Sequence, residues 1–258
     1  MMRARVLPAL DGARWLGFGW RCFKAAPLGW IAIVFAYVFL MTLVSMVPFV
    51  GVVAAMVLVP GFSVSFMEAS RAAAHGGGVG VAVLFSGFRE RPGAQLALGA
   101  LYVALMMAML AASTLADDGT LARWLASGRR PEVEAVRSDA FLGALALAAL
   151  VYSQVMMLFW FSPVLAAWHG TGVVKALFFS YVAVLMNWRA FLAYGVVAAI
   201  ATVVAPFTAL LVLGLLAGGK AQVAAAGMVF PLLLIVMPVL FASFYASVRD
   251  VFGPQGAP

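Results

Sequence analysis

Long apolar runs alternate with short polar connections along the whole chain. Each run holds almost no charged side chain and reaches the length of about 20 residues that a helix needs to cross the roughly 30 Å hydrocarbon core of a bilayer. The runs are apolar on all sides, as expected of a helix surrounded by lipid. The sequence therefore predicts six transmembrane helices, at about 28–48, 50–70, 94–115, 140–162, 190–216 and 222–247.

The composition excludes an ordinary soluble domain. Hydrophobic residues make up 66% of the 258 residues and charged residues only 10%, whereas a typical soluble domain carries about 25% charged residues. One soluble core could not enclose so much apolar surface, so the natural solvent of this surface is lipid. The expected fold class is an all-α integral membrane protein, with residues 1–258 forming a single membrane domain.

Lysine and arginine residues predict the orientation of the helices, because they are enriched in segments on the cytoplasmic side. Eleven of the 16 basic residues fall in the N-terminal segment, the second and fourth connections and the C-terminal tail. The other five are Arg123, Arg129, Arg130, Arg137 and Lys220. We therefore expect both termini in the cytoplasm. Topology also accounts for the net charge of +7, so no nucleic-acid partner is predicted.

A short pattern recurs before the odd-numbered spans. Residues 23–27 and 88–92 each read as an aromatic residue, a base and then a proline that can open a helix, with a weaker counterpart at 186–189. Upstream of each pattern lies an apolar stretch too short to span a bilayer. These stretches, at about 12–25, 79–90 and 173–186, are expected to form interfacial helices.

The ends of the second and sixth spans also match each other. Segments 60–71 and 238–249 align at a proline, a Ser-Phe pair and an arginine. Each unit contains an even number of spans, so the repeats are parallel. We infer three parallel repeats of interfacial helix plus helical hairpin, with units of about 11–75, 79–169 and 172–252.

The first interfacial stretch has a clear amphipathic pattern. Asp11 is expected to be its N-cap. Trp15, Phe18, Cys22 and Phe23 share one helical face, and the bases share the other: Arg14, Arg21 and Lys24. Such a helix should lie in the headgroup region of the bilayer. In the external connection 116–139, residues 120–126 predict a further short amphipathic helix that ends near Gly128.

Two polar side chains inside the spans are candidate functional contacts. Glu68 lies near one end of the second span and can pair with Arg71, three residues later on the same face. This carboxylate is read either as an interfacial ion pair or as a functional group. Gln154 lies near the middle of the fourth span, where its amide needs a partner on another helix or a substrate.

The third candidate feature is a ring of bases at one depth of the bilayer. Basic pockets between helices bind anionic lipid headgroups, although a biased topology alone also produces such a ring. The candidate headgroup contacts are Arg21, Lys24, Arg89, Arg91, Lys175 and Arg189. No catalytic motif is found, and the two histidines and one cysteine do not compose a metal site. We therefore expect no enzyme activity and no cofactor.

Two stretches, 57–76 (VLVPGFSVSFMEASRAAAHG) and 162–195 (SPVLAAWHGTGVVKALFFSYVAVLMNWRAFLAYG), carry a family resemblance. They resemble uncharacterised six-span bacterial inner-membrane proteins. Their layout is similar to the membrane domain that accompanies some glycerophosphodiester phosphodiesterases. The resemblance implies an inner-membrane location and no established chemistry, because the phosphodiesterase domain itself is absent.

Two functional hypotheses remain. The first is a non-enzymatic accessory or assembly subunit that acts through helix packing, with membrane lipids, other membrane proteins or a second copy as partners. The alternative is a lipid- or small-molecule-handling channel or carrier. The alternative requires a polar stripe that faces a shared cavity, and it fails if the polar side chains of the spans pair locally. The residues that decide are Ser45, Ser113, Thr114, Gln154, Thr202 and Thr208.

Overall fold

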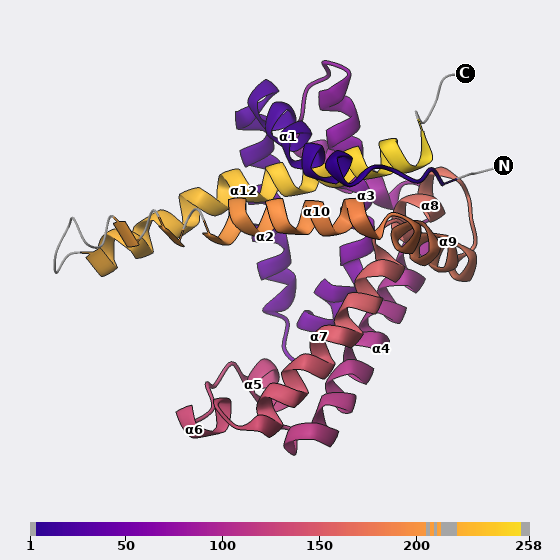
Figure 1. The fold of residues 1–258 in the computed structure, drawn as a ribbon. Coiled ribbons are helices and arrows are strands. Elements are labelled where there is room, and N and C mark those ends of the chain that lie inside the picture. The colour runs from indigo at the N-terminus through magenta and orange to yellow at the C-terminus, as the bar shows by residue number, and fades with distance from the viewer. Residues whose placement is uncertain (1–3, 205–206, 209–210, 213–220, 254–258) are drawn as a thin grey trace.

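The described part of the chain is helical, with short turns between the helices (Figure 1). The structure is a computed structural model that describes residues 4–204, 207–208, 211–212 and 221–253. Five helical segments in it are long and apolar enough to cross a membrane, and a sixth is added if one bent pair of helices counts as a single span. The sequence prediction of a multi-span helical membrane protein is therefore confirmed.

The described helices are grouped below by the three predicted units. The first group contains α1 (Ala9–Ala25), α2 (Pro27–Ser45) and α3 (Gly51–Ala74). The second contains η1 (Val81–Phe88), α4 (Pro92–Asp117), α5 (Thr120–Ser127), α6 (Val133–Val136), α7 (Asp139–Phe159) and α8 (Ser162–Trp168). The third contains α9 (Val173–Met186), α10 (Trp188–Ala199), η2 (Ile200–Val204) and α12 (Ala221–Phe252).

Most predicted boundaries agree with the structure, and the prolines at 27 and 92 open α2 and α4 as expected. The short helix predicted at 120–126 is α5, which ends at Gly128 with a positive φ of 68°. The fourth predicted span is longer than expected, because α8 continues it to His169. The fifth predicted span is bent away from α9 by 80°, and its predicted end at 216 lies outside the described residues.

Asp11 is not the N-cap of α1. The helix begins at Ala9 after Pro8, and the Pro8 carbonyl oxygen accepts from the backbone N–H of Asp11. Pro8 occupies the N-cap position, and no side-chain hydrogen bond caps the first turn. The Asp11 carboxylate instead accepts from Arg14 at 2.9 Å.

The three hairpins do not run in one direction. Figure 1 shows α4 and α7 running down the view, whereas α10 and α12 run across it. Helix α3 contributes side chains to the two largest buried clusters, and it packs against α2, α4, η1 and α12. The backbone N–H of Arg5 donates to the carbonyl oxygen of Val251, so the first and last described segments lie side by side. Three equivalent repeats are therefore not confirmed and stay a prediction.

Helix α1 lies against α10 and α12 through two glycines seven residues apart. A Cβ atom added at Gly12 would overlap the backbone carbonyl of Ala190 in α10. One added at Gly19 would overlap the carbonyl of Val239 in α12. Glycine permits this close approach of helix backbones, which is a common way to pack helices in membranes. The two contacts fix the position of α1 across the third hairpin.

We predict that Gly19→Ala destabilises the protein, because the new methyl group meets rigid backbone. Overpacking of this kind typically costs about 1–3 kcal/mol. Thermal unfolding in a single detergent measures the change. Gly17→Ala is the matched control on the same helix, since a Cβ there meets only the Arg21 guanidinium at 3.8 Å. Alanine should leave that variant as stable as the parent or about 0.5–1 kcal/mol more stable. Equal loss in both variants would contradict the packing.

Candidate functional site

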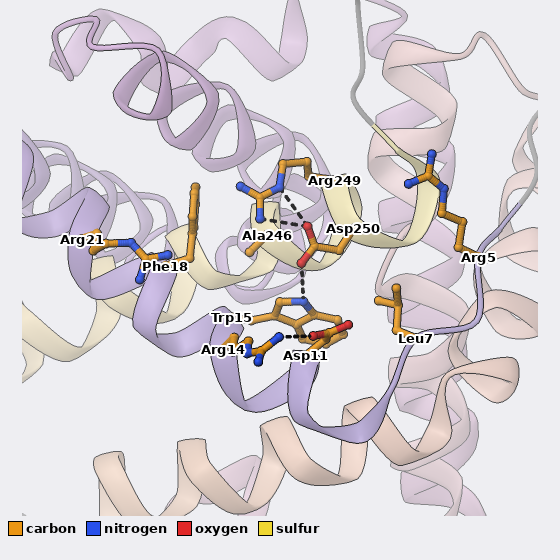
Figure 2. Close-up of a pocket in the computed structure, with 10 residues that line it drawn as sticks. All are labelled: Arg5, Leu7, Asp11, Arg14, Trp15, Phe18, Arg21, Ala246, Arg249 and Asp250. Carbon is orange, nitrogen blue, oxygen red and sulfur yellow. Dashed lines mark hydrogen bonds and ion pairs between the residues drawn. The ribbon is translucent and has the colours of Figure 1, made fainter.

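A basic pocket of about 500 Å³ lies between α1, α12 and the N-terminal segment (Figure 2). We call it the arginine pocket. Its charged lining residues are four arginines and two aspartates, which gives it a net charge of +2: Arg5, Arg14, Arg21, Arg249, Asp11 and Asp250. The wall is completed by apolar side chains, among them Trp15 and Phe18. Such a pocket favours an anion with an apolar neighbouring group.

Hydrogen bonds join the two helices that form the pocket. The indole N–H of Trp15 in α1 donates to the Asp250 carboxylate in α12 at 3.0 Å. Arg249 donates to the other oxygen of this carboxylate at 2.9 Å. Trp15 is almost completely buried, and its ring packs on Phe191 and Tyr194 of α10. The carboxylate of Asp250 is therefore used in holding the site together.

Two arginines of the pocket have no carboxylate partner in the part of the chain that the structure describes. Arg14 pairs with Asp11, and Arg249 pairs with Asp250. Arg5 and Arg21 have no acidic side chain within ion-pair distance among the described residues. In the view of Figure 2 these two side chains lie at opposite ends of the pocket, with Phe18 close to Arg21. Their charges are therefore available to an anion.

Phe18 separates two of the guanidinium groups. The guanidinium carbon of Arg249 lies 4.7 Å from the centre of the Phe18 ring, and that of Arg21 lies 6.0 Å from it. An aromatic face attracts cations, so the ring lets two positive charges approach one region of the pocket. The arrangement keeps both side chains next to the cavity.

Asn187 attaches the N-terminal segment to the body of the protein. Its side-chain oxygen accepts from the backbone N–H of Leu7 at 2.8 Å, and its nitrogen donates to the carbonyl of Arg5 at 2.9 Å. The backbone N–H of Arg5 in turn donates to Val251 in α12. Asn187 is buried and precedes α10 without capping it by a side-chain hydrogen bond. These bonds place Arg5 at the pocket.

The six bases predicted as headgroup contacts do not gather at one site. Only Arg21 lines the arginine pocket. Lys24 lies over the ring of Trp20, at 5.9 Å from its centre. The guanidinium carbon of Arg189 lies 5.3 Å from the centre of the neighbouring Trp188 ring. The ammonium nitrogen of Lys175 lies 5.7 Å from the centre of the Phe179 ring. A common predicted depth in the bilayer therefore does not bring these six bases around one cavity.

The other two predicted bases lie around the second hairpin. Arg89 lines a smaller cavity of about 240 Å³ between η1, α3 and α8. Arg91 precedes α4 with a positive φ of 51°, which is unusual for a residue other than glycine. Its guanidinium points to the carbonyl oxygen of Thr171, 3.5 Å away, and so approaches the connection between α8 and α9.

The two predicted intramembrane polar residues both bond to other helices. Glu68 accepts from the indole N–H of Trp168 in α8 at 2.6 Å. Its other oxygen lies 3.2 Å from Arg71, so the predicted ion pair is confirmed. The side-chain oxygen of Gln154 accepts from the Tyr181 hydroxyl of α9 at 2.9 Å, which is the interhelical partner expected for an amide within a span.

The polar stripe that a carrier needs is not found among the described residues. The hydroxyl groups each donate to a backbone carbonyl only three or four residues earlier in the chain, in Ser45, Ser113, Thr114, Thr202 and Thr208. Gln154 is bonded to Tyr181 and Ser153. The carrier alternative was expected to fail if these polar side chains pair locally, so a polar pathway through the spans lacks support. The described residues also hold no cluster of three metal-binding side chains.

The sequence reasoning missed Arg5, Arg249 and Asp250 as parts of one site. Arg5 and Arg249 are readable only as bases near the chain ends, and Asp250 as a neighbour of Arg249. The bond between Trp15 and Asp250 joins residues 235 positions apart, which no local pattern indicates. The available signal was the spacing of Arg14 and Arg21 on one face of a predicted interfacial helix.

One curated relative covers the whole chain. It is a probable inner membrane protein of Burkholderia thailandensis, 38% identical over 268 aligned residues that span 100% of this chain and 97% of the relative. The chain belongs to the family of this protein. No protein-family model matches the sequence, and no solved structure matches the fold. The relationship establishes an inner-membrane protein and names no ligand.

We predict that Asn187→Ala releases the N-terminal segment. Loss of its hydrogen bonds to Arg5 and Leu7 should raise the rate of trypsin cleavage after Arg5 by at least about fivefold, since each of the two contributes about 0.5–1.5 kcal/mol. Mass spectrometry of the detergent-solubilised protein follows the cleavage. Gln154→Ala is the control, because the side-chain amide of Gln154 makes its hydrogen bonds in another part of the structure. An unchanged rate in Asn187→Ala would contradict the attachment.

Cys22 reports whether α1 is packed. Its side chain is 5% exposed, and its carbonyl oxygen accepts from the Trp30 indole at 3.1 Å. Burial raises the pKa of the Cys22 thiol to about 11, and Arg21 and Arg249 oppose only part of this effect. An unfolded cysteine has a pKa of about 8.5. The stability that the neutral thiol contributes is therefore present below a pH of about 8.5 and is lost as the pH rises toward about 11.

We predict that maleimide modifies Cys22 far more slowly in the folded protein than after unfolding in dodecyl sulfate. At about pH 8 the raised pKa lowers the thiolate fraction by about two orders of magnitude, before burial restricts access further. Intact-mass spectrometry over time gives both rates, and the single cysteine makes the assignment unambiguous. Similar rates in the two states would mean that α1 does not bury this side chain.

Proposed function

We propose that this protein is a non-enzymatic inner-membrane protein that binds an anionic phospholipid headgroup in the arginine pocket. The observation that carries the proposal is the pair of arginines, Arg5 and Arg21, that line a cavity of about 500 Å³ without carboxylate partners among the described residues. The proposal keeps the anionic-lipid partner expected from the sequence. It replaces the six-residue ring by a site that shares only Arg21 with it.

The chemistry of the lining favours phosphate. Guanidinium groups donate two parallel hydrogen bonds to a phosphate and stay charged at any physiological pH. Asp11 and Asp250 repel an anion, but each is already paired with an arginine of the pocket. The guanidinium groups of Arg5 and Arg21, at the two ends of the pocket, therefore each offer a phosphate site, with the apolar wall next to the glycerol and acyl groups.

The topology is part of the proposal. Arg5 and Arg249, from the first and last described segments, both line the arginine pocket, and most of the bases lie in the segments predicted to be cytoplasmic. We place this side in the cytoplasm, where anionic lipid attracts basic segments. The bent pair α9 and α10 then serves as the fifth of six spans. The similarity to the membrane domain of some glycerophosphodiester phosphodiesterases stays an expectation and does not support the binding site.

An accessory or assembly role through helix packing is compatible with this proposal. Many large apolar side chains of α2, α4 and α7 are exposed in the single chain and contact either lipid or a partner. Native purification in mild detergent, followed by mass spectrometry, separates the two roles. A protein partner in fixed stoichiometry supports the accessory role, and a defined anionic lipid on the lone protein supports the lipid-binding role.

We predict that the double variant Arg5→Gln with Arg21→Gln binds phosphatidylglycerol at least about tenfold more weakly, because each charged hydrogen bond contributes about 1.5–3 kcal/mol. Native mass spectrometry of lipid-bound states measures the affinity. The matched control is Lys175→Gln with Arg189→Gln, which removes the same charge away from the pocket. A control that loses as much affinity would contradict a specific site.

The source of the phosphate is tested in the same preparation. Inorganic phosphate, short-chain phosphatidylglycerol and phosphatidylcholine are added to the detergent-solubilised protein at equal concentration. The proposal expects protection against thermal unfolding by phosphatidylglycerol alone. Equal protection by inorganic phosphate would assign the pocket to a soluble phosphate compound, and equal protection by phosphatidylcholine would show that the arginines do not select charge.

A further inference from the structure

A second cavity lies on the other side of α1. This groove has a volume of about 400 Å³ and is enclosed by α1, α10, η2 and α12. Its α1 wall is formed by Ala13, Leu16, Gly17 and Trp20, whereas the arginine pocket uses Asp11, Arg14, Trp15, Phe18 and Arg21. The two sets alternate at helical spacing, so they occupy different faces of one helix. We call this cavity the apolar groove.

The lining of the apolar groove offers almost no polar group. Its walls on α12 are aliphatic and include Ile235 and Val239. Thr202 is the one hydroxyl residue that lines it, and this hydroxyl donates to the carbonyl of Ala198 in its own helical segment. A water molecule in such a site would lack the two to four polar partners that it requires. The lining of the groove therefore suits a hydrocarbon chain and not water.

Gly17 leaves space in the groove. Of the three glycines in α1, Gly12 and Gly19 allow contact with neighbouring backbone, whereas Gly17 contacts no neighbouring helix. A Cβ atom added at Gly17 would meet only the Arg21 guanidinium at 3.8 Å. Packing therefore does not require glycine at this position. The missing side chain widens the groove next to Trp20.

A cation and an aromatic ring lie at the α1 end of the groove. The Lys24 ammonium is 5.9 Å from the centre of the Trp20 ring, and this ring also stacks on Phe23 at 5.7 Å. Trp20 lines the groove and is 45% exposed. Tryptophan and lysine side by side are typical of the boundary between lipid headgroups and hydrocarbon. An anionic group bound at Lys24 would have its attached chain beside the groove.

We propose that the apolar groove binds one acyl chain of an anionic membrane phospholipid whose phosphate contacts Lys24. The groove lies between α10 and α12, whose segments Trp188–Val204 and Leu234–Phe252 belong to the parts of the chain apolar enough for the bilayer. The occupant is therefore drawn directly from the surrounding membrane. This site is separate from the arginine pocket and does not depend on the function proposed for it.

The test uses nanodiscs that contain phosphatidylglycerol with a photoreactive diazirine in its acyl chain. After illumination, mass spectrometry of peptides locates the crosslinks in wild-type protein and in Gly17→Trp, whose indole fills the groove. The expected result is crosslinks to groove residues of α1 and α10 in the wild type and loss of most of them in Gly17→Trp. Gly195→Trp is the control, because Gly195 faces open space on α10 outside the groove.

Further variants make the test decisive. Val197→Trp blocks the groove from the α10 wall and replaces Gly17→Trp if that variant unfolds. Lys24→Gln should reduce the preference for phosphatidylglycerol over phosphatidylcholine about fivefold. The Arg5→Gln variant should leave the groove crosslinks unchanged, which separates this site from the arginine pocket. Crosslinks that persist in both tryptophan variants, or that are absent from the wild-type groove, would overturn the proposal.

Discussion

Close backbone contact between α1 and the third hairpin is the constraint on which the proposed sites depend. Gly12 and Gly19 let α1 touch the carbonyl groups of Ala190 and Val239. In a bilayer the surrounding lipid is as apolar as the helices, so hydrophobic attraction gives little drive for association and close van der Waals packing becomes important. A bulkier residue at either glycine would lift α1 away and would separate Trp15 from Asp250.

The position of α1 explains why two different cavities adjoin one short helix. One of its faces carries Arg14, Phe18 and Arg21 toward the arginine pocket, and the opposite face carries Leu16, Gly17 and Trp20 toward the apolar groove. The buried face between them carries the glycine contacts and Cys22. An amphipathic helix at a membrane boundary needs only a polar and an apolar side. The buried face, packed against α10 and α12, therefore fixes the directions in which the pocket face and the groove face of α1 point.

The sequence predicted the helices better than the site. Apolar length located the spans, and the bounds of α9 agree with the predicted stretch 173–186, because both features are local. The bend between α9 and α10 and the crosswise third hairpin depend on packing and left no local pattern. The prediction grouped Arg21 with Lys175 and Arg189 because all three are expected at one depth in the bilayer. Lys175 and Arg189 do not line the arginine pocket, since depth alone does not specify on which side of the helix bundle a residue lies. Asn187 holds Arg5 across 182 positions, a contact that no spacing rule contains.

Amide hydrogen exchange of α1 in lipid nanodiscs tests the central claim most directly. If α1 is packed on α10 and α12, the amides of residues 12–23 should exchange as slowly as those of the buried helix α3. Helix α5, which is also short and amphipathic but has few buried residues, serves as the internal reference and should exchange faster. Exchange in α1 as fast as in α5 would mean that α1 rests loosely on the membrane surface and that neither the arginine pocket nor the apolar groove is formed.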